Sequence, residues 1–280
     1  MQDGMPSRTA LRAAAHRAAH QLLEGGRVFA DPLAVRILAR DPRAIVDEAR
    51  AHPDRRGMRF FIAARTRFAE DALAKAVAAG VAQVVILGAG LDTFAYRTPL
   101  RDRLRIFEVD HPATQAWKRE RLASAGIAVP SALTYAPVDF ERESLSDGLR
   151  GAGFDQHAPA FFTWLGVVPY LREEAVWSTL AFVAALRGAA EIVFDYGEPR
   201  SALSTLRRAE RDARARHVAQ LGEPWITTFD PTALHEGLRR LGFTVIDDLS
   251  PRDIAARYLR EPAGDAPDRG GHVLRASTRA

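Results

Sequence analysis

The sequence predicts an α/β protein with a doubly wound, mostly parallel sheet, helices on both faces of the sheet and a helical extension at the N-terminus. Residues 81–87 form a short, β-branched, apolar run that stops at Gly88, which is typical of a parallel strand buried on both faces. Similar runs alternate with helical patterns through the rest of the chain. Residues 1–80, before the first of these strands, show only helical patterns.

The N-terminal extension divides into several predicted helices. Apolar residues on one face predict a docked helix over residues 9–24, closed by a glycine pair, rather than an organelle transit peptide. Asp31 and Asp41 each precede a proline, so each is expected to cap a helix that starts at that proline. A long helix is expected over residues 57–79. We therefore expect residues 1–80 to form a helical lid or substrate wall.

The remainder of the chain is expected to form the sheet-containing core, residues 81–280. The predicted strands cover residues 81–87, 104–110, 133–138, 160–165, 191–196, 242–246 and 271–276, and the predicted helices cover residues 112–125, 141–149, 173–186, 201–220 and 231–241. A helical cover is expected as an insertion at about residues 197–230, because it follows the carboxyl end of a strand. A solvated crossover helix would give the same pattern over residues 201–220. Residues 261–269 are rich in Pro, Gly and Asp and predict an exposed loop.

The turn after the first strand carries the clearest ligand signal. Gly88 and Gly90, with Ala89 between them, allow a tight turn and let a ligand approach bare backbone. A dinucleotide-binding turn would continue to a third glycine, but Thr93 stands there, and Asp92 would repel a pyrophosphate. The turn therefore favours an adenosine-type cofactor without phosphates. S-adenosylmethionine fits, because it has a ribose, an amino group and a positively charged sulfonium.

Further candidate residues stand at the carboxyl ends of the predicted strands, where sheets of this kind bind ligands. These positions are residues 88–90, Asp110, Asp139 with Phe140, Leu165 with Gly166, and Asp195 with Tyr196. Each aspartate alone is most simply a helix N-cap. Together with the glycine turn, the three aspartates favour a ligand with several hydroxyl and amine donors.

The chain also resembles a known family over roughly residues 8–250. The segments that carry the resemblance are residues 29–34 (FADPLA), 64–67 (ARTR), 87–93 (LGAGLDT) with Tyr96 and Arg97, 107–112 (FEVDHP) and 163–171 (TWLGVVPYL). In this order and at this spacing they resemble the leucine carboxyl methyltransferase-like family of S-adenosylmethionine-dependent methyltransferases, which has a Rossmann-like sheet. The chain looks closer to the bacterial and secondary-metabolic branch than to the eukaryotic enzyme that methylates a phosphatase tail.

The resemblance implies roles for individual residues. Arg65 would pair with the cofactor's carboxylate, which suits a guanidinium fork. Asp110 would accept hydrogen bonds from the ribose hydroxyls, and Asp139 would bind the adenine amino group with Phe140 beside it. The implied cofactor-binding residues are Arg65, Gly88, Ala89, Gly90, Asp110, Asp139, Phe140 and Leu165. The protein-tail enzymes carry a Glu where this chain has Leu165, so their substrate is not carried over to it.

The expected function is O-methyl transfer to a carboxylate or phenol of a small molecule, such as a polyketide or another secondary metabolite. A phenol or alcohol would benefit from a general base, whereas a carboxylate is already ionised at neutral pH. His111, Tyr196 and Tyr170 stand near the strand ends, but each has a simpler structural explanation, such as helix capping at His111. The catalytic residues therefore stay unassigned, which favours a carboxylate or an easily ionised phenol.

Composition narrows the other possibilities. The 280 residues include no cysteine, which excludes disulfides and thiolate metal sites. The net charge is only +4 and the arginines are spread along the chain, so we expect solvated faces rather than nucleic-acid binding. No run approaches the ~20 apolar residues of a membrane span. His16 and His20 lie one helical turn apart without a third ligand, and no metal is expected. A cytoplasmic location is expected, and the oligomeric state stays open.

Two other functions remain open at this point. A protein that binds S-adenosylmethionine without turnover would have the same cofactor residues. A nicotinamide-dependent dehydrogenase would share the glycine turn and the distal acids, but Thr93 and the late start of the sheet disfavour it.

Overall fold

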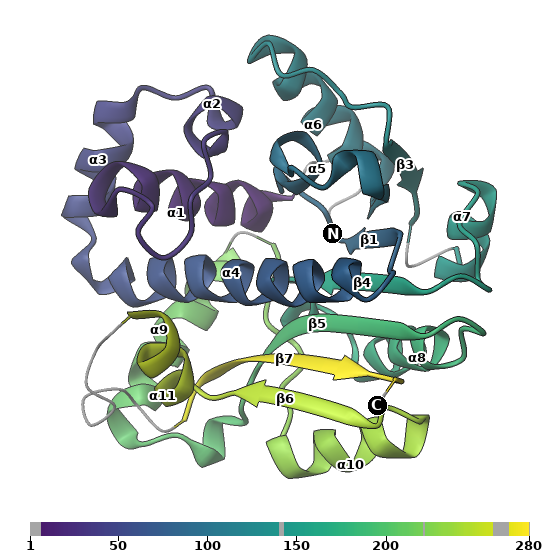
Figure 1. The fold of residues 1–280 in the computed structure, drawn as a ribbon. Helices are drawn as coiled ribbons and strands as arrows, with labels where there is room; N and C mark the ends of the chain where they lie inside the picture. The colour runs from purple at the N-terminus through teal and green to yellow at the C-terminus, as the bar shows by residue number, and fades with distance from the viewer. Residues whose placement is uncertain (1–6, 140–142, 221, 260–268, 280) are drawn as a thin grey trace.

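The computed structural model describes residues 7–139, 143–220, 222–259 and 269–279. Its centre is a seven-stranded sheet with the order β3-β2-β1-β4-β5-β7-β6 (Figure 1). The strands are β1 Gln83–Leu87, β2 Arg105–Asp110, β3 Leu133–Pro137, β4 Ala160–Trp164, β5 Ala190–Gly197, β6 Val245–Leu249 and β7 Gly271–Ser277. The first five strands pair in parallel, and β7 runs antiparallel to both β5 and β6. This arrangement confirms the predicted doubly wound, mostly parallel α/β fold.

In the described residues, four α-helices precede the sheet. They are α1 Arg8–Glu24, α2 Ala34–Leu38, α3 Pro42–Ala51 and α4 Arg56–Ala78, with a short 3-10 turn, η1 Pro53–Arg55, before α4. Helix α1 ends where Gly25 adopts a left-handed conformation (φ 61°), as its C-cap position requires. Asp41 caps α3 by accepting a hydrogen bond from the Arg43 amide, as predicted.

The prediction for Asp31 was wrong in its helix boundary. Helix α2 begins at Ala34 rather than at Pro32, and no side chain caps it. The Asp31 carboxylate instead accepts hydrogen bonds from the Leu33 amide (3.0 Å) and from the Thr93 hydroxyl (2.7 Å). It is fully buried, 3.4 Å from the Arg17 guanidinium. A buried charge needs such partners, so Asp31 joins the N-terminal helices to the turn after β1.

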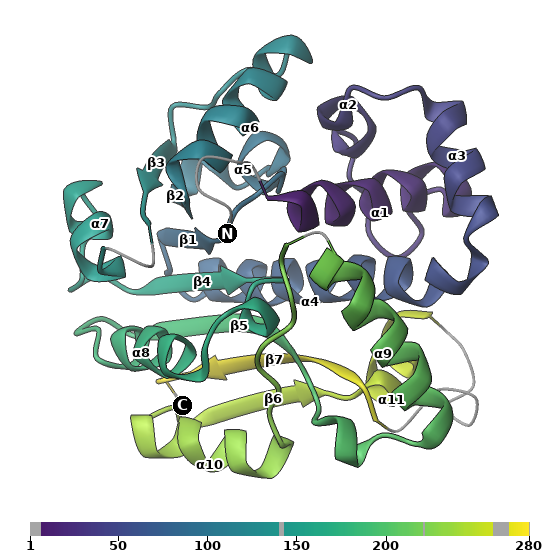
Figure 2. The ribbon, with the colours of Figure 1, turned by 180° about the vertical axis from the view of Figure 1, so that it is seen from behind.

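Helices cover both faces of the sheet, because alternate residues of its central strands point to opposite sides. Val84 and Ile86 of β1 join a hydrophobic cluster with α1, α2 and α4. Val85 and Leu87 join a second cluster with α7, α8 and α10. Helix α4 therefore lies on one face (Figure 1) and α8 on the other (Figure 2). The remaining helices are α5 Phe94–Arg97, α6 Pro112–Ser124, α7 Leu145–Gly151, α8 Glu173–Ala184, α9 Thr205–Gln220, α10 Pro231–Leu241 and α11 Pro251–Ile254.

Three predicted boundaries shift for local reasons. The helix expected over residues 141–149 begins at Leu145, because Ser144 caps it by accepting from the Asp147 amide. The strand expected at residues 242–246 begins at Val245, because Gly242 is the left-handed C-cap of α10 (φ 103°). The charged helix expected from residue 201 begins at Thr205, after the 3-10 turn η4 Arg200–Ala202. The expected loop over residues 261–269 lies, apart from Arg269, outside the described residues.

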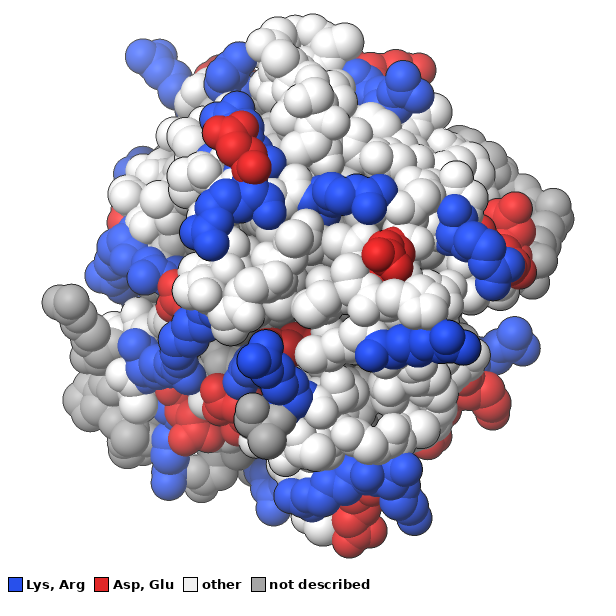
Figure 3. All heavy atoms as spheres, turned by 45° about the vertical axis from the view of Figure 1, so that its right-hand side comes forward, with Lys and Arg blue, Asp and Glu red and all other residues white. Residues whose placement is uncertain are grey.

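Basic and acidic side chains are interspersed on the face in Figure 3, with uncharged residues between them. Basic residues do not gather there into one continuous stripe. In the described part of the chain, none of the helices has both the length and the apolarity of a membrane span.

Candidate active site

A cavity of about 1620 Å³ opens at the carboxyl ends of β1, β2, β4 and β5. Residues from the ends of these four strands form its floor, among them Leu87, Asp110, Thr163 and Asp195. Side chains of α1, of the start of α4 and of α9 complete its walls, together with residues 222–228. The site expected from the strand ends is therefore a single large cavity. It is enclosed by elements from both ends of the chain.

The glycine turn after β1 lies against two neighbours. Gly88 (φ 64°) and Gly90 (φ 45°) both adopt left-handed conformations. A Cβ atom at Gly88 would lie 2.4 Å from a methyl group of Val167. A Cβ atom at Gly90 would lie 2.8 Å from the Cβ atom of Ala10. Both positions thus require glycine, for conformation and for space. Ala89 is buried between them, and its amide donates to the Val109 carbonyl (3.2 Å).

Asp110 at the end of β2 is joined to this turn. Its Oδ2 accepts a hydrogen bond from the Gly90 amide (2.6 Å), and its Oδ1 accepts from the His111 amide (2.7 Å). Burial raises the pKa of Asp110, and the two amide hydrogen bonds act in the opposite direction. Each carboxylate oxygen keeps a second lone pair, which is what two ribose hydroxyls would use.

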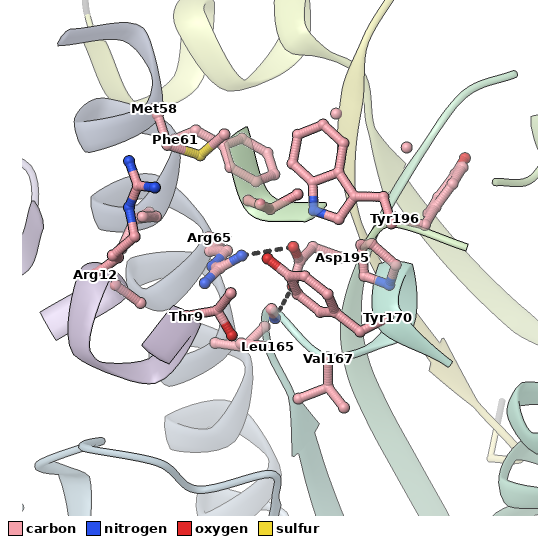
Figure 4. A pocket seen from close by; sticks show the side chains of 18 of the residues that line it. Thr9, Arg12, Met58, Phe61, Arg65, Leu165, Val167, Tyr170, Asp195 and Tyr196 are labelled. Atoms are coloured by element: carbon pink, nitrogen blue, oxygen red, sulfur yellow. Dashed lines mark hydrogen bonds and ion pairs between the residues drawn. The ribbon is translucent and has the colours of Figure 1, made fainter. Parts of the chain in front are cut away.

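Arg65 of α4 lines the same cavity as the turn and is held by Asp195. Its Nη1 donates to Asp195 Oδ2 (2.6 Å), and Asp195 Oδ1 accepts from the Gly166 amide (2.5 Å; Figure 4). Its Nη2 lies so close to Gly166 that a Cβ atom there would be 2.6 Å away. Its Nε is buried without a hydrogen-bond partner among the described residues. The Nε side of the guanidinium is therefore a donor edge without an acceptor.

The other predicted cofactor residues are Asp139, Phe140 and Leu165. Asp139 and Leu165 both line the cavity. The Asp139 amide donates to the Glu143 carboxylate (2.9 Å), across the gap in the described residues. Phe140 lies outside the described residues.

The three candidate bases have different surroundings. His111 lines the cavity, but its Nδ1 accepts from the Ala113 amide (3.2 Å) and so caps α6. The Tyr196 hydroxyl donates to Asp248 (2.6 Å), and its ring stacks on His272; Figure 4 shows this hydroxyl pointing away from Arg65. The Tyr170 hydroxyl points toward Arg65 and Asp195, and burial raises its pKa. Tyr196 therefore lines the cavity, but its hydroxyl is engaged by Asp248 within the fold.

Sequence reasoning missed two cavity residues on α1. Arg12 was not singled out, and His16 was weighed only as a zinc ligand with His20. His20 is instead buried, with its Nδ1 3.2 Å from Glu24. The described residues contain no cluster of three or more His, Cys, Asp or Glu side chains that could hold a metal. The spacing of Thr9, Arg12 and His16, three and four residues apart, is the signal that places them on one helical face.

A third missed residue, Glu223, closes the cavity at the first turn of α1. Its carboxylate accepts hydrogen bonds from the Arg8 amide (2.9 Å) and the Thr9 amide (3.0 Å). An acidic side chain at these unpaired amides is favourable, because they form the positive end of the helix. The segment after α9 is thereby attached to the N-terminal helix.

The residues of the cavity fit the expected cofactor. The glycine turn lines the cavity, and glycine there lets a ligand approach backbone atoms. Asp110 offers acceptors for ribose hydroxyls, and the buried Arg65 Nε lacks the acceptor that a carboxylate would supply. Asp92 and Asp195 also line the cavity, so its acids suit a ligand with ammonium and sulfonium charges.

Solved structures share this fold. A "putative methyltransferase" from Thermobifida fusca YX superposes with a TM-score of 0.58 at 18% identity, covering 100% of this chain and 97% of that one. A DUF574 family protein from Streptomyces avermitilis superposes with a TM-score of 0.52 at 16% identity, covering 94% and 96%. At these identities the likeness concerns the fold.

Sequence comparison identifies the family. The model of the leucine carboxyl methyltransferase family matches residues 10–184. A Bacillus subtilis (strain 168) protein named "Putative S-adenosyl-L-methionine-dependent methyltransferase YktD" is 36% identical over 68% of this chain and 63% of its own length. A Saccharopolyspora erythraea protein with the same description is 32% identical over 73% of this chain and 66% of its own length. The chain thus spans just under two thirds of these relatives. It belongs to the leucine carboxyl methyltransferase family of S-adenosylmethionine-dependent methyltransferases.

Proposed function

We propose that the protein transfers a methyl group from S-adenosylmethionine to an oxygen of a small molecule, either a carboxylate or an easily ionised phenol. One observation supports S-adenosylmethionine as the methyl donor. Arg65 is oriented by Asp195, and its buried Nε has no partner among the described residues. Arg65 lines the same cavity as the glycine turn and Asp110. A cofactor with a ribose at one end and a carboxylate at the other would satisfy both groups.

The chemistry that the cofactor supplies is an activated methyl group on a sulfonium, which an oxygen nucleophile displaces in line. The protein's contribution is to position the two reactants and to exclude water, and positioning can lower the barrier by about 7–11 kcal/mol. The walls from α1, α4 and α9 fit this task, because they enclose the strand ends. We propose that residues 1–80 act as the lid or acceptor wall, and that residues 197–230 form a helical cover over the core of residues 81–280.

The surroundings of the candidate bases support an acceptor that is already ionised. Tyr196 is hydrogen-bonded to Asp248, and His111 caps α6. His16 lines the cavity, but burial and nearby arginines lower its pKa to about 4, which makes it a weak base. A carboxylate needs no proton removed at neutral pH. Apolar side chains such as Met58 and Phe61 also line the cavity, in keeping with a secondary metabolite such as a polyketide as acceptor.

Calorimetry is the first test. The protein should bind S-adenosylmethionine and S-adenosylhomocysteine at one site and should not bind NAD. Binding of NAD alone would favour a dehydrogenase instead.

The second test measures turnover. Release of S-adenosylhomocysteine should occur with members of a panel of aromatic and aliphatic acids and acidic phenols, and not with the matching amides and methyl ethers. Tight cofactor binding with no turnover across the panel would favour a protein that binds the cofactor without catalysis. Turnover with amines alone would contradict O-methylation.

A further inference from the structure

One side of the cavity is lined by a regular stripe on each of two helices. Thr9, Arg12 and His16 lie on one face of α1, and all three line the cavity. Met58 and Phe61 lie on α4, two turns and one turn before Arg65, and both line the cavity. Figure 4 shows Arg12, Met58 and Phe61 projecting from these helices toward the cavity. This side of the cavity therefore combines apolar surface with cationic side chains.

Most arginines of this region are already paired. The Arg59 guanidinium donates three hydrogen bonds to Glu24 (2.7–3.1 Å). Arg17 donates to the Leu91 carbonyl (2.5 Å) and lies 3.4 Å from Asp31. Arg65 is held by Asp195. These three cations are neutralised within the protein.

Arg12 and Arg55 are not paired in this way. Arg12 Nη1 is buried and has no hydrogen-bond partner among the described residues. Arg55 stands at the N-cap position of α4, and in the described part of the chain its side chain has neither an ion pair nor a hydrogen bond. Arg12 and Arg55 line the same cavity, and burial, followed by the charge of Arg55, lowers the pKa of Arg12. Two cations in one cavity with no ion pair of their own are costly where the site is partly buried.

Among the described residues, the acid that interacts with these two arginines already has another partner. The Glu48 carboxylate interacts with both Arg12 and Arg55, but it lies 2.7 Å from the Arg40 guanidinium, with which it forms an ion pair. No side chain caps the N-terminus of α4, whose first residues, Arg56 and Gly57, also line the cavity. The positive end of a 23-residue helix adds to the field of the two arginines. An anionic group from outside the chain would complete this cluster.

We propose that Arg12 and Arg55 bind an anionic group of the acceptor, a carboxylate or a similar oxyanion, apart from the oxygen that is methylated. The body of the acceptor would then pack on Met58 and Phe61. The protein's substrate would be an amphipathic acid that keeps one charged group after methylation. This inference rests on the proposed function, because it assigns Arg65 to the cofactor and Arg12 with Arg55 to the acceptor.

Two fluorescent probes test the inference. Anilinonaphthalene sulfonate has an apolar ring system with one anionic group, and anilinonaphthalene has the same rings without it. Wild-type protein saturated with S-adenosylhomocysteine should bind the sulfonate about 10-fold more tightly than the neutral probe, as expected for charge-assisted hydrogen bonds. R12Q and R55Q should each remove most of that preference and leave the affinity for the neutral probe unchanged. R12K should keep part of it, because the charge remains.

The control is R67Q, which removes an exposed arginine on the outer face of α4 and should change neither affinity. Equal affinity of the wild type for the two probes, or an unchanged preference in both R12Q and R55Q, would overturn the inference. So would a loss of S-adenosylhomocysteine affinity in R12Q as large as in R65A, because the arginine pair would then serve the cofactor. If the wild type fails to bind S-adenosylhomocysteine, the proposed function fails. In that case, comparing the two probes without S-adenosylhomocysteine still decides whether the anion site exists.

Discussion

Arg65 belongs both to the buried structure and to the lining of the cavity. Its ion pair with Asp195 is nearly inaccessible to water, with side-chain exposures of 9% and 5%. Breaking such a pair by removing one partner typically costs about 3–5 kcal/mol, because the other charge is left buried. Asp195 therefore orients the guanidinium, and the cost of losing Arg65 would appear in stability as well as in binding.

We expect Arg65→Ala to weaken the binding of S-adenosylmethionine and of S-adenosylhomocysteine by about 1.5–3 kcal/mol each, because both ligands carry the carboxylate. Arg65→Lys should recover only part of the loss, since an ammonium cannot form a bidentate fork. Calorimetry measures the affinities, and urea denaturation measures the separate loss of stability. Arg67→Ala is the matched control. A loss in that variant with none in Arg65→Ala would show that the wrong arginine was assigned.

His16 makes folding sensitive to acid. Burial, followed by the charges of Arg12, Arg59, Arg55 and Arg65, lowers its pKa from 6.5 to about 4. Between pH 6.5 and about pH 4, His16 is protonated in the unfolded chain and neutral in the folded protein. The free energy of unfolding therefore falls as the pH drops through this range. His16 should account for about 2–3 kcal/mol of the loss of stability between neutral pH and about pH 4.5.

His16→Gln should therefore show a smaller acid-induced loss of stability than the wild type, by about that amount. Urea denaturation at the two pH values measures the difference. His157→Gln, which replaces an exposed histidine, serves as the control and should follow the wild type. Parallel stability curves for wild type and His16→Gln would contradict the buried, neutral state of His16.

At the scale of secondary structure, α1 packs directly on the glycine turn. The contact between Ala10 and Gly90 is so close that a methyl group at Gly90 would lie 2.8 Å from that of Ala10. The helix is held from the other side by Glu223 at its first turn. The position of α1 and the shape of the turn are therefore coupled.

Gly90→Ala should destabilise the protein by about 1–3 kcal/mol and weaken S-adenosylhomocysteine binding, because it forces α1 and the turn apart. Ala10→Gly alone should cost about 1 kcal/mol as a glycine within a helix. The double variant should be more stable than the sum of the two changes predicts, by about 0.5–2 kcal/mol, because the clash is relieved. Denaturation of all four proteins gives this coupling energy, and strict additivity would contradict the contact.

At the scale of the whole molecule, two distant parts of the chain enclose one site. Residues of α1 and α4 form one wall, and α9 with residues 222–228 forms another. Glu223 joins the two walls across more than two hundred residues of sequence, with separations of 214 and 215 in its two amide hydrogen bonds. Closure of the site over a ligand would then involve both walls together.

Hydrogen exchange can follow this closure. Residues 1–80 and 197–230 should both become more protected with cofactor and acceptor than with cofactor alone. In Glu223→Ala the first turn of α1 should exchange faster, and the acceptor-dependent protection should weaken. Asp212→Ala removes an exposed ion pair with Arg200 in the same cover and should behave as the wild type. Acceptor-dependent protection confined to other segments would place the acceptor elsewhere.

The strands and their order of appearance were predictable because their signals are local. A strand buried on both faces must be apolar throughout, and residues 81–87 have that pattern. The glycine turn was predictable because left-handed backbone selects glycine. The predicted ends of helices and strands were wrong where a helix cap sets the boundary, as at Ser144 and Gly242. The position of a cap depends on which amide or backbone conformation the neighbouring chain requires.

The pairing of charges was not predictable, because it depends on contacts between distant segments. Asp195 and Arg65 are 130 residues apart, and no local pattern links them. Asp31 has the sequence context of a simple N-cap, yet burial beside Arg17 and Thr93 changes its role. Sequence periodicity and glycine placement thus determine the sheet and the glycine turn after β1. The partner of each charged group, and the presence of Arg12 and His16 in the cavity, follow only from tertiary packing, because burial decides which charges need a partner.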